Sequence, residues 1–303
     1  MDIPLLPRLS GAELAQARLP EAEPILAPIL NSKSLALLYG PRGLGKTFVA
    51  LGIARAAAMG EGFLGWTAPR PHRVLYVDGE MAAAEMRQRL LRFGPPPDTL
   101  DFILADLNRG PILDLARGDD QARLMKSWGQ PELVVLDNLA SLAGIKDGDP
   151  DRWHELQRFL VLQRQFGRAV LMIHHANKKG LQRGSSRRED VLDLVMAMRR
   201  PDDWTPADGT QFEIHFEKTR SLHGPAIEPL AVHLDDRGDS QRWSWHAADR
   251  ILERAAALLD KGMSAIDMGE ALGVSRATAF RLQKRARRLG LLAALPPTTG
   301  AAA

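Results

Sequence analysis

The sequence predicts an α/β protein with a mostly parallel sheet flanked by helices, followed by a small all-α domain. Three observations predict it. Short runs such as 34–40 (SLALLYG) and 132–138 (ELVVLDN) are apolar throughout, as in strands buried on both faces. Helical patterns separate these runs, and this alternation is typical of parallel sheets covered by helices. From about residue 247 the pattern is helical only.

The elements follow in order along the chain. Residues 1–30 are punctuated by proline, and we expect an N-terminal arm there. Residues 31–246 are expected to form the α/β domain. Its predicted strands lie at 34–40, 73–79, 132–138 and 169–175, and its predicted helices at 46–59, 82–93, 119–128 and 151–166.

After residue 190 the pattern of apolar and polar residues changes. Residues 211–219 (QFEIHFEKT) alternate apolar and polar side chains, and 227–234 and 241–245 also read as strands, so an antiparallel extension of the sheet is expected. Residues 201–210 read as a loop. The all-α domain is expected at 247–293, with helices at 248–260, 264–272 and 275–289, and a disordered tail at 294–303.

Composition narrows the function classes. The 303 residues contain no cysteine, which excludes disulfides, cysteine-ligated zinc and thiol catalysis and agrees with a reducing compartment. No apolar run approaches the roughly 20 residues that span a membrane, and the N-terminus lacks a signal-peptide pattern. We therefore expect a cytoplasmic protein without a membrane partner. The net charge of +3 is weak evidence by itself.

One glycine-rich segment carries a specific signal. It fits G-x-x-x-x-G-K-[ST] at every fixed position, after a predicted strand and before a predicted helix. Backbone amides of such a loop surround phosphate oxygens, aided by the positive end of the helix dipole. A plain glycine-rich turn is the alternative, which the flanking elements disfavour. The expected nucleotide-binding residues are Gly40, Pro41, Arg42, Gly43, Leu44, Gly45, Lys46, Thr47 and Phe48.

Four side chains at or beside this loop are candidates for a role in hydrolysis. Lys46 would reach the β- and γ-phosphates, and the Thr47 hydroxyl would bind Mg²⁺ together with Asp137 at the end of a strand. Glu80, which follows another strand, is the candidate for orienting the attacking water. The alternatives are a turn-capping role for Asp137 and a first-turn helix role for Glu80. Asp78 is ambiguous.

These residues also carry a resemblance to a known group. LYVDGEM (75–81) and LVVLDNLASL (133–142) resemble the RecA-type ATPase core over about residues 30–235. LMIHHANKKG (171–180), followed by RGSS, is similar to RepA-like hexameric plasmid replicative helicases, AAA family ATPases of mobile elements. The resemblance implies ATP and Mg²⁺ at subunit interfaces of a ring and movement along single-stranded DNA. It also implies a core site of Lys46, Thr47, Glu80 and Asp137.

His174 and His175 end the strand at 169–175. The resemblance implies that a polar residue here senses the γ-phosphate, and we choose His174 for this role. A structural histidine is the alternative for either. A zinc pair is disfavoured, since adjacent strand residues point to opposite faces.

Basic residues later in the chain are candidates for action on a neighbouring subunit. Lys218 and Arg220 have the i, i+2 spacing that places both on one face of a strand. They resemble the paired basic finger of RecA/DnaB-type rings, which reaches the neighbour's γ-phosphate. Arg199 and Arg200 are a weaker choice for the finger. A solvated basic strand end is the alternative.

Two regions are candidates for DNA contact. Residues 177–190 form a basic, glycine- and serine-containing segment whose Lys178, Lys179, Arg183 and Arg187 could contact DNA phosphates, or could be an ordinary solvated loop. It contains no aromatic residue, so no base stacking is expected there.

Residues 264–289 read as helix, glycine-containing turn and helix, resembling helix-turn-helix domains. Ser275 would cap the second helix, with Val274, Ala279 and Leu282 packed on the first. The expected DNA contacts on the second helix are Arg276, Thr278, Arg281 and Lys284. A basic protein-interaction or lid domain is the alternative.

Together these features predict an ATP-hydrolysing, DNA-dependent motor, a homo-oligomer with hexameric symmetry. Single-stranded DNA would pass through the core, and duplex would bind the C-terminal domain. The alternative is an ATP-regulated DNA-binding initiator or transcription regulator without unwinding activity. A filament-forming recombination accessory is disfavoured, because no N-terminal polymerisation strand is evident. The choice between ATP and GTP stays open, because the loop contacts the phosphates, which both nucleotides share, and not the purine.

Overall fold

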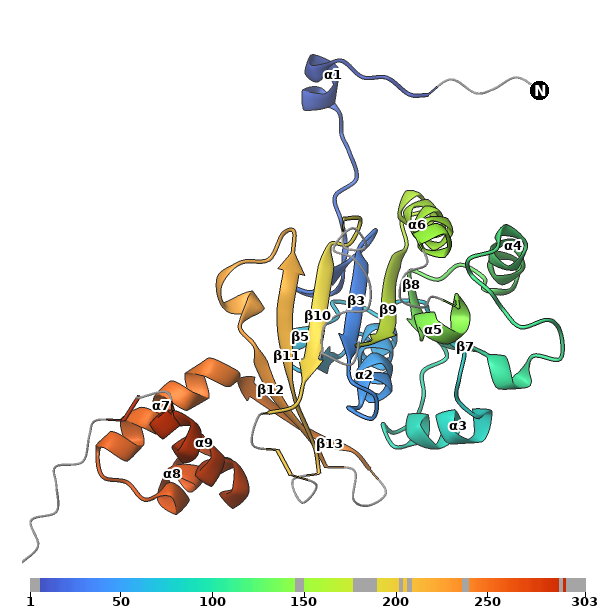
Figure 1. The fold of residues 1–303 in the computed structure, drawn as a ribbon. Coiled ribbons are helices and arrows are strands. Elements are labelled where there is room, and N and C mark those ends of the chain that lie inside the picture. The colour runs from blue at the N-terminus through green and yellow to red at the C-terminus, as the bar shows by residue number, and fades with distance from the viewer. Residues whose placement is uncertain are drawn as a thin grey trace, which may run out of the picture.

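A nine-stranded sheet forms the centre of the protein (Figure 1). The computed structural model describes residues 6–144, 150–176, 190–201, 204–205, 209–235, 240–288 and 291–292. The strand order is β13-β12-β11-β10-β3-β9-β8-β6-β7, with β10 through β7 parallel and the remaining pairs antiparallel. The strands are β3 (Leu35–Gly40), β6 (Val74–Asp78), β7 (Leu100–Leu104), β8 (Leu133–Asp137), β9 (Ala169–His175), β10 (Leu194–Arg199), β11 (Thr210–Thr219), β12 (Leu230–Asp235) and β13 (Arg242–Ala247).

Helices cover both faces of this sheet and give it two separate apolar layers. On one face α2 and α3 pack against alternate strand residues such as Leu38 and Leu171, and on the other α4, α5 and α6 pack against Leu37 and Met172. This three-layer arrangement confirms the predicted α/β class. The helices are α2 (Lys46–Met59), α3 (Ala83–Leu91), α4 (Gly118–Ser127), α5 (Leu139–Leu142) and α6 (Pro150–Gln165).

The central strands are fully buried because their sequences are apolar on both sides. Every residue of β3, β6 and β8 is buried. Two strands of the nine-stranded sheet were not predicted. β7 is only partly buried and carries Asp101, which interrupts its apolar run. β10 lies where the antiparallel extension was expected, yet it pairs in parallel with β3, and the antiparallel part begins at β11.

The N-terminal segment is only partly an arm. Figure 1 shows α1 (Gly11–Gln16) projecting from the body, and this helix has no buried residue. Residues 24–30, in contrast, belong to the core, because the hairpin of β1 (Pro24–Leu26) and β2 (Leu30–Asn31) buries its leucine and isoleucine side chains beside α2. A second hairpin, β4 (Gly62–Phe63) with β5 (Trp66–Thr67), also packs there. The predicted arm of residues 1–30 is therefore too long.

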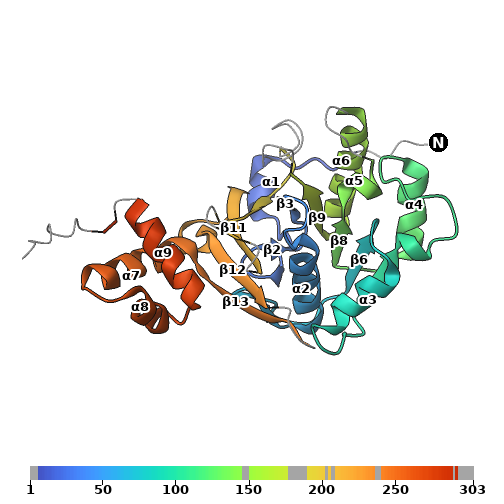
Figure 2. The ribbon, with the colours of Figure 1, turned by 60° about the horizontal axis from the view of Figure 1, so that its bottom comes forward.

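Three helices follow β13 directly and form a bundle beside the antiparallel strands (Figures 1 and 2). They are α7 (Ala248–Asp260), α8 (Ala265–Leu272) and α9 (Arg276–Arg288). The bundle has its own apolar cluster, which includes Met268, Ala279 and Leu282. The turn between α8 and α9 contains Gly273 at φ 66°, and the Ser275 hydroxyl accepts the Thr278 N–H at 3.2 Å. The predicted helix, turn and helix are present.

Candidate functional site

The glycine-rich loop joins β3 to α2 as predicted, and its glycines have specific tasks. Gly43 and Gly45 have φ of 71° and 96°, in the left-handed region that favours glycine. A Cβ on Gly40 would lie 2.7 Å from the Met198 carbonyl oxygen, so a larger residue would push β10 away. Leu44 is buried in the α2 layer and anchors the loop from below. The loop is therefore held in a shape that no ordinary turn sequence would adopt.

A cavity of about 450 Å³ lies over this loop. Of the predicted nucleotide-binding residues, Gly43, Gly45, Lys46, Thr47 and Phe48 line it. Gly40 and Pro41 contribute through their carbonyl oxygens, which accept hydrogen bonds from Lys46 Nζ at 2.9 and 2.7 Å. The side chain of Arg42 does not line the cavity.

Lys46 is a buried cation. Its side chain is 5% exposed, and burial lowers its pKa from 10.5 to about 8, against the opposing pull of Asp137 and Glu80. The two loop carbonyls satisfy its ammonium in this state. A polyphosphate would stabilise this buried ammonium better than neutral carbonyls do, because hydrogen bonds between two charged groups are stronger and offset more of the desolvation cost.

Asp137 and Thr47 come together at the base of the cavity. Asp137 ends β8 and is buried, and its carboxylate accepts hydrogen bonds from Tyr76 Oη at 2.7 Å and from the Thr47 hydroxyl. Burial raises the pKa of Asp137. Among the described residues, no group of three or more His, Cys, Asp or Glu could hold a metal alone. Two protein oxygens still fit Mg²⁺ in a nucleotide site, where phosphates and water complete the coordination.

Asp78 and Glu80 lie beside Asp137 because β6 pairs with β8 in register at their ends. Oδ1 of Asp78 accepts the N–H groups of Glu80 at 3.1 Å and Met81 at 2.7 Å, so Asp78 shapes the turn that carries Glu80. Burial raises the pKa of Asp78 to about 6. This positioning role resolves what the sequence left ambiguous.

Glu80 points into the cavity with its side chain 63% exposed, as a residue that must meet water requires. Two neighbours hold its carboxylate. The Asn138 side-chain amide donates to Oε2, and Nε2 of His175 lies 3.8 Å from the same oxygen. Asn138 carries no sequence signal for this contact beyond its position directly after Asp137.

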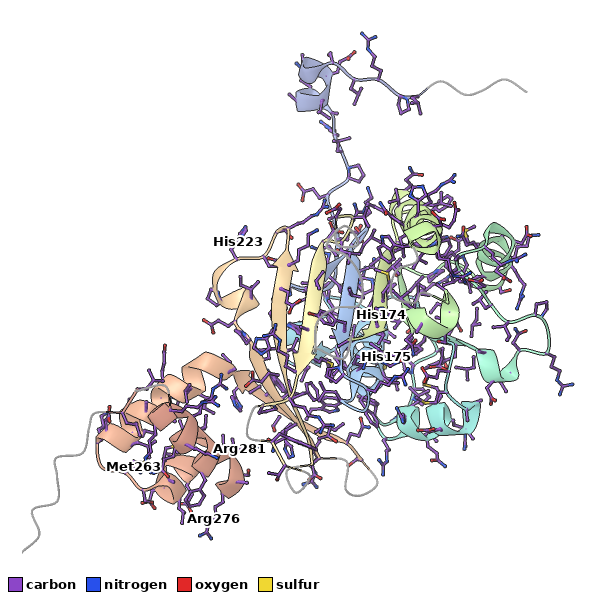
Figure 3. All side chains as sticks on the ribbon, in the orientation of Figure 1. His174, His175, His223, Met263, Arg276 and Arg281 are labelled. Carbon is purple, nitrogen blue, oxygen red and sulfur yellow. The ribbon has the colours of Figure 1, made fainter. Side chains whose placement is uncertain are left out.

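The choice of His174 as the residue facing the nucleotide is wrong in this structure, since His175 lines the cavity. β9 pairs with β3 so that His175 lies opposite Gly40 and His174 opposite Tyr39. Alternation then places His174 with Met172, on the face away from α2, where it is 2% exposed. Figure 3 shows both histidines at the carboxyl end of β9.

The outer wall of the cavity was not predicted beyond Phe48. It consists of Met81 and Ala82, which precede α3, and of Glu85 and Arg89 on α3. The guanidinium of Arg89 lies 4.7 Å from the centre of the Phe48 ring and pairs with Glu85. This wall combines an aromatic face with a cation.

Lys218 and Arg220 lie at the opposite edge of the sheet from this cavity. Lys218 pairs with Val195 and Thr219 with Leu194, at the amino end of β10. Arg220 donates to the carbonyl of Asp190, and its Nε is 3.7 Å from Asp193 Oδ1. The length of a strand separates the two sites, and β3 is about 20 Å long. Neither side chain can therefore reach the cavity of its own chain.

The predicted DNA contacts of α9 differ in exposure. Arg276 and Lys284 are exposed, and Arg276 lies 5.9 Å from the exposed Phe280 ring. Thr278 and Arg281 instead line a narrow cavity against β11 and β12, with Arg281 donating to the Thr278 hydroxyl at 2.8 Å. Figure 3 shows Arg281 turned toward the sheet and Arg276 away from it. Thr278 and Arg281 are therefore half-buried beside the sheet, and their contact with DNA stays a prediction. The other predicted contacts, Lys178, Lys179, Arg183 and Arg187, lie outside the described residues.

Comparisons with known proteins agree with this geometry. The family described as AAA domain matches residues 4–180. The DNA repair protein RadA of Brucella abortus (strain 2308) is 27% identical over 210 residues, 68% of this chain and 40% of RadA, so the chain spans well under half of that relative. A KaiC-like protein of Pyrococcus horikoshii OT3 has the same fold, with a TM-score of 0.51 and 13% identity over 73% of this chain and 93% of the other.

The fold shared with the KaiC-like protein supports the predicted RecA-like phosphate-loop core. In the part of the chain that the structure describes, no helix combines the length and apolar character needed to cross a bilayer.

Proposed function

This chain belongs to the AAA domain family, and on that premise we propose that it is an ATP-hydrolysing motor that acts on DNA. The observation that carries the hydrolytic part is the convergence of Lys46, Glu80 and Asp137 on one cavity. DNA as the partner is supported by the likeness to a DNA repair protein and by the basic face of α9. In its specific form the proposal is a ring-forming replicative helicase of a plasmid or other mobile element.

The chemistry follows from the residues that line the cavity. The loop amides bind the phosphates of ATP, and Lys46 exchanges two carbonyl partners for the β- and γ-phosphate oxygens. Thr47 and Asp137 would hold Mg²⁺, which when bound neutralises charge on the phosphates. Glu80, oriented by Asn138, accepts the proton of the water whose oxygen attacks the γ-phosphorus as the bond to the bridging oxygen breaks. His175 stands beside Glu80 and can report the γ-phosphate.

The location of the basic finger supports an oligomer. Lys218 and Arg220 lie at the amino edge of the strands, and the cavity lies at the carboxyl edge. If they stabilise the transition state, they do so in a neighbouring subunit, which a ring such as a hexamer provides. In mixed assemblies, Arg220→Ala subunits should then lower ATP turnover by more than the fraction of variant subunits, because each also disables a wild-type neighbour. ATP turnover that falls only in proportion to the variant fraction would contradict the role of the finger.

The alternative is an ATP-regulated DNA-binding initiator or transcription regulator. One observation favours it: the three C-terminal helices have their own apolar cluster and expose Arg276 and Lys284 on one helix. In that case the helical domain binds duplex DNA and the ATPase controls its assembly.

The test combines ATP turnover with strand displacement by the purified protein. A motor hydrolyses ATP faster with single-stranded DNA, displaces a labelled strand, and keeps the DNA-stimulated turnover when residues 248–303 are deleted. A regulator binds one duplex sequence tightly and loses its function with the same deletion. Glu80→Gln is the control, because it should bind ATP and not turn it over. Turnover by Glu80→Gln at the wild-type rate would contradict the site assignment.

A further inference from the structure

A second charged site lies between α9 and the carboxyl end of β10, on the sheet side of the C-terminal helices. It is a cavity of about 310 Å³, which we call the basic groove. Five basic side chains and one acidic side chain, Glu213, line it together with Pro201 and His215. The basic ones are Arg199, Arg200, Lys284, Arg285 and Arg288.

The single acid in the basic groove is already neutralised. Glu213 is buried, and its two carboxylate oxygens are taken by Arg285 Nη1 at 2.8 Å and His215 Nε2 at 2.9 Å. These bonds also fasten α9 to β11. Arg199 has a separate partner, since its Nη2 lies 2.6 Å from Glu217 Oε1. Glu213 therefore leaves little negative charge to oppose an incoming anion.

Two cations of the basic groove have no carboxylate contact among the described residues, Arg200 and Lys284. Both are exposed. The guanidinium of Arg200 lies 3.8 Å from the centre of the Trp204 ring, which fixes its plane while leaving its N–H groups available. An ordered guanidinium and a second cation across a cleft suit successive phosphates of one backbone.

The basic groove is also connected to the nucleotide cavity. Thr210 at the start of β11 lines the nucleotide cavity, while Glu213 and His215 further along β11 line the basic groove. The two sites thus share one strand.

We propose that the basic groove binds the sugar-phosphate backbone of a single DNA strand through Arg200 and Lys284. The inference rests on the proposed function for the identity of the polymer. A cavity of about 310 Å³ is in the range that holds a drug-sized ligand, which matches a short segment of one strand better than a duplex. The strand would pass between α9 and the end of β10 and would contact Arg199 and Arg200, which the sequence offered only as weaker candidates for the finger.

The test measures binding of a fluorescein-labelled oligothymidylate to the full-length protein by anisotropy between about 50 and about 200 mM salt. Arg200→Ala and Lys284→Ala should each make the slope of log K against log salt shallower by about 0.7, because each removes one phosphate contact on a single strand. Lys126→Ala is the matched control, an exposed lysine on α4 at the other side of the domain, and its slope should equal that of wild type.

A second measurement locates the strand directly. The chain has no cysteine, so a single cysteine can carry a photocrosslinker. Pro201→Cys, in the basic groove, should crosslink the oligothymidylate, and Lys126→Cys should not. Wild-type slopes in Arg200→Ala and Lys284→Ala, or no crosslink from position 201, would overturn the inference.

The outcomes separate this inference from the proposed function. If DNA stimulates ATP turnover but both variants keep the wild-type salt slope, the result contradicts the groove and leaves the proposed motor standing. If the variants change the salt slope but DNA does not stimulate ATP turnover, the result supports the groove and contradicts the motor. Competition by a polyglutamate peptide as effective as unlabelled oligothymidylate would assign the groove to an acidic protein partner and overturn the inference.

Discussion

Replacing Lys46 by methionine should stabilise the nucleotide-free protein while abolishing its response to ATP. Lys46 is 5% exposed, and burial lowers its pKa from 10.5 to about 8. The folded chain therefore keeps a charge at neutral pH that it would hold more easily when unfolded. Methionine has a similar length and carries no charge, so it removes this cost and also removes the group that binds phosphate.

The magnitude follows from the pKa and the two hydrogen bonds. Lowering the pKa from 10.5 to about 8 corresponds to a cost on the order of 3 kcal/mol for the charged form. The carbonyls of Gly40 and Pro41 lose their donor in the variant, at about 1 kcal/mol for each. We expect Lys46→Met to raise the free energy of unfolding at pH 7 by about 1 kcal/mol.

The pH dependence gives the sharper assay. Between pH 8 and 10.5 the unfolded wild-type chain still binds this proton and the folded chain does not, so wild-type stability rises with pH relative to the variant. Urea titrations should show the variant's advantage shrinking by about 3 kcal/mol across that window and reversing. Lys126→Met, at an exposed lysine, should show no such change. A stability difference between Lys46→Met and wild type that is flat from pH 7 to 10.5 would refute the reasoning.

Three further predictions concern the same sites. Asp137→Asn should cut ATP turnover, measured as phosphate release, by at least about 100-fold while a fluorescent ADP analogue still binds, since the phosphate loop is intact. His175→Ala should slow phosphate release by about 10-fold or more because it removes the neighbour of Glu80; equal loss in an alanine variant of the buried His174 would contradict this. Gly269→Ala should destabilise the C-terminal helices by about 1–3 kcal/mol, because the new Cβ would lie 2.7 Å from Ala279 Cβ. Thermal unfolding should show this as a lower melting temperature. The variant's ATP turnover without DNA should match wild type.

The phosphate loop and the central strands could be predicted because their signals are local. The runs at 34–40 and 132–138 are apolar at every position but their ends, and only strands buried on both faces require that. The G-x-x-x-x-G-K-T spacing encodes its own backbone shape through Gly43 and Gly45. The structure has α2 at Lys46–Met59, the predicted bounds.

The side chains that depend on distant partners could not be predicted. Alternation along β9 shows that His174 and His175 face opposite ways, but only the register against β3 decides which one meets the nucleotide. Helical periodicity in α9 likewise separates a buried stripe from two flanks. Periodicity does not predict that β11 and β12 lie against the flank that carries Thr278 and Arg281. In both cases the missing information is a tertiary contact between segments far apart in sequence.

β11 relates the three regions that the proposed motor needs. Thr210 at its start lines the nucleotide cavity, Glu213 in its middle binds Arg285 of α9, and the strand ends at Thr219 beside Arg220. Residues 210–212 pair with β12 alone, Glu213 and Ile214 pair with both β12 and β10, and the rest of the strand pairs with β10. In the proposed motor we therefore expect a nucleotide that shifts the start of β11 to shift the Glu213–Arg285 contact as well, and with it the position of α9 beside the basic groove. ATP binding and strand binding would then be coupled through β11, without a contact between the two ligands.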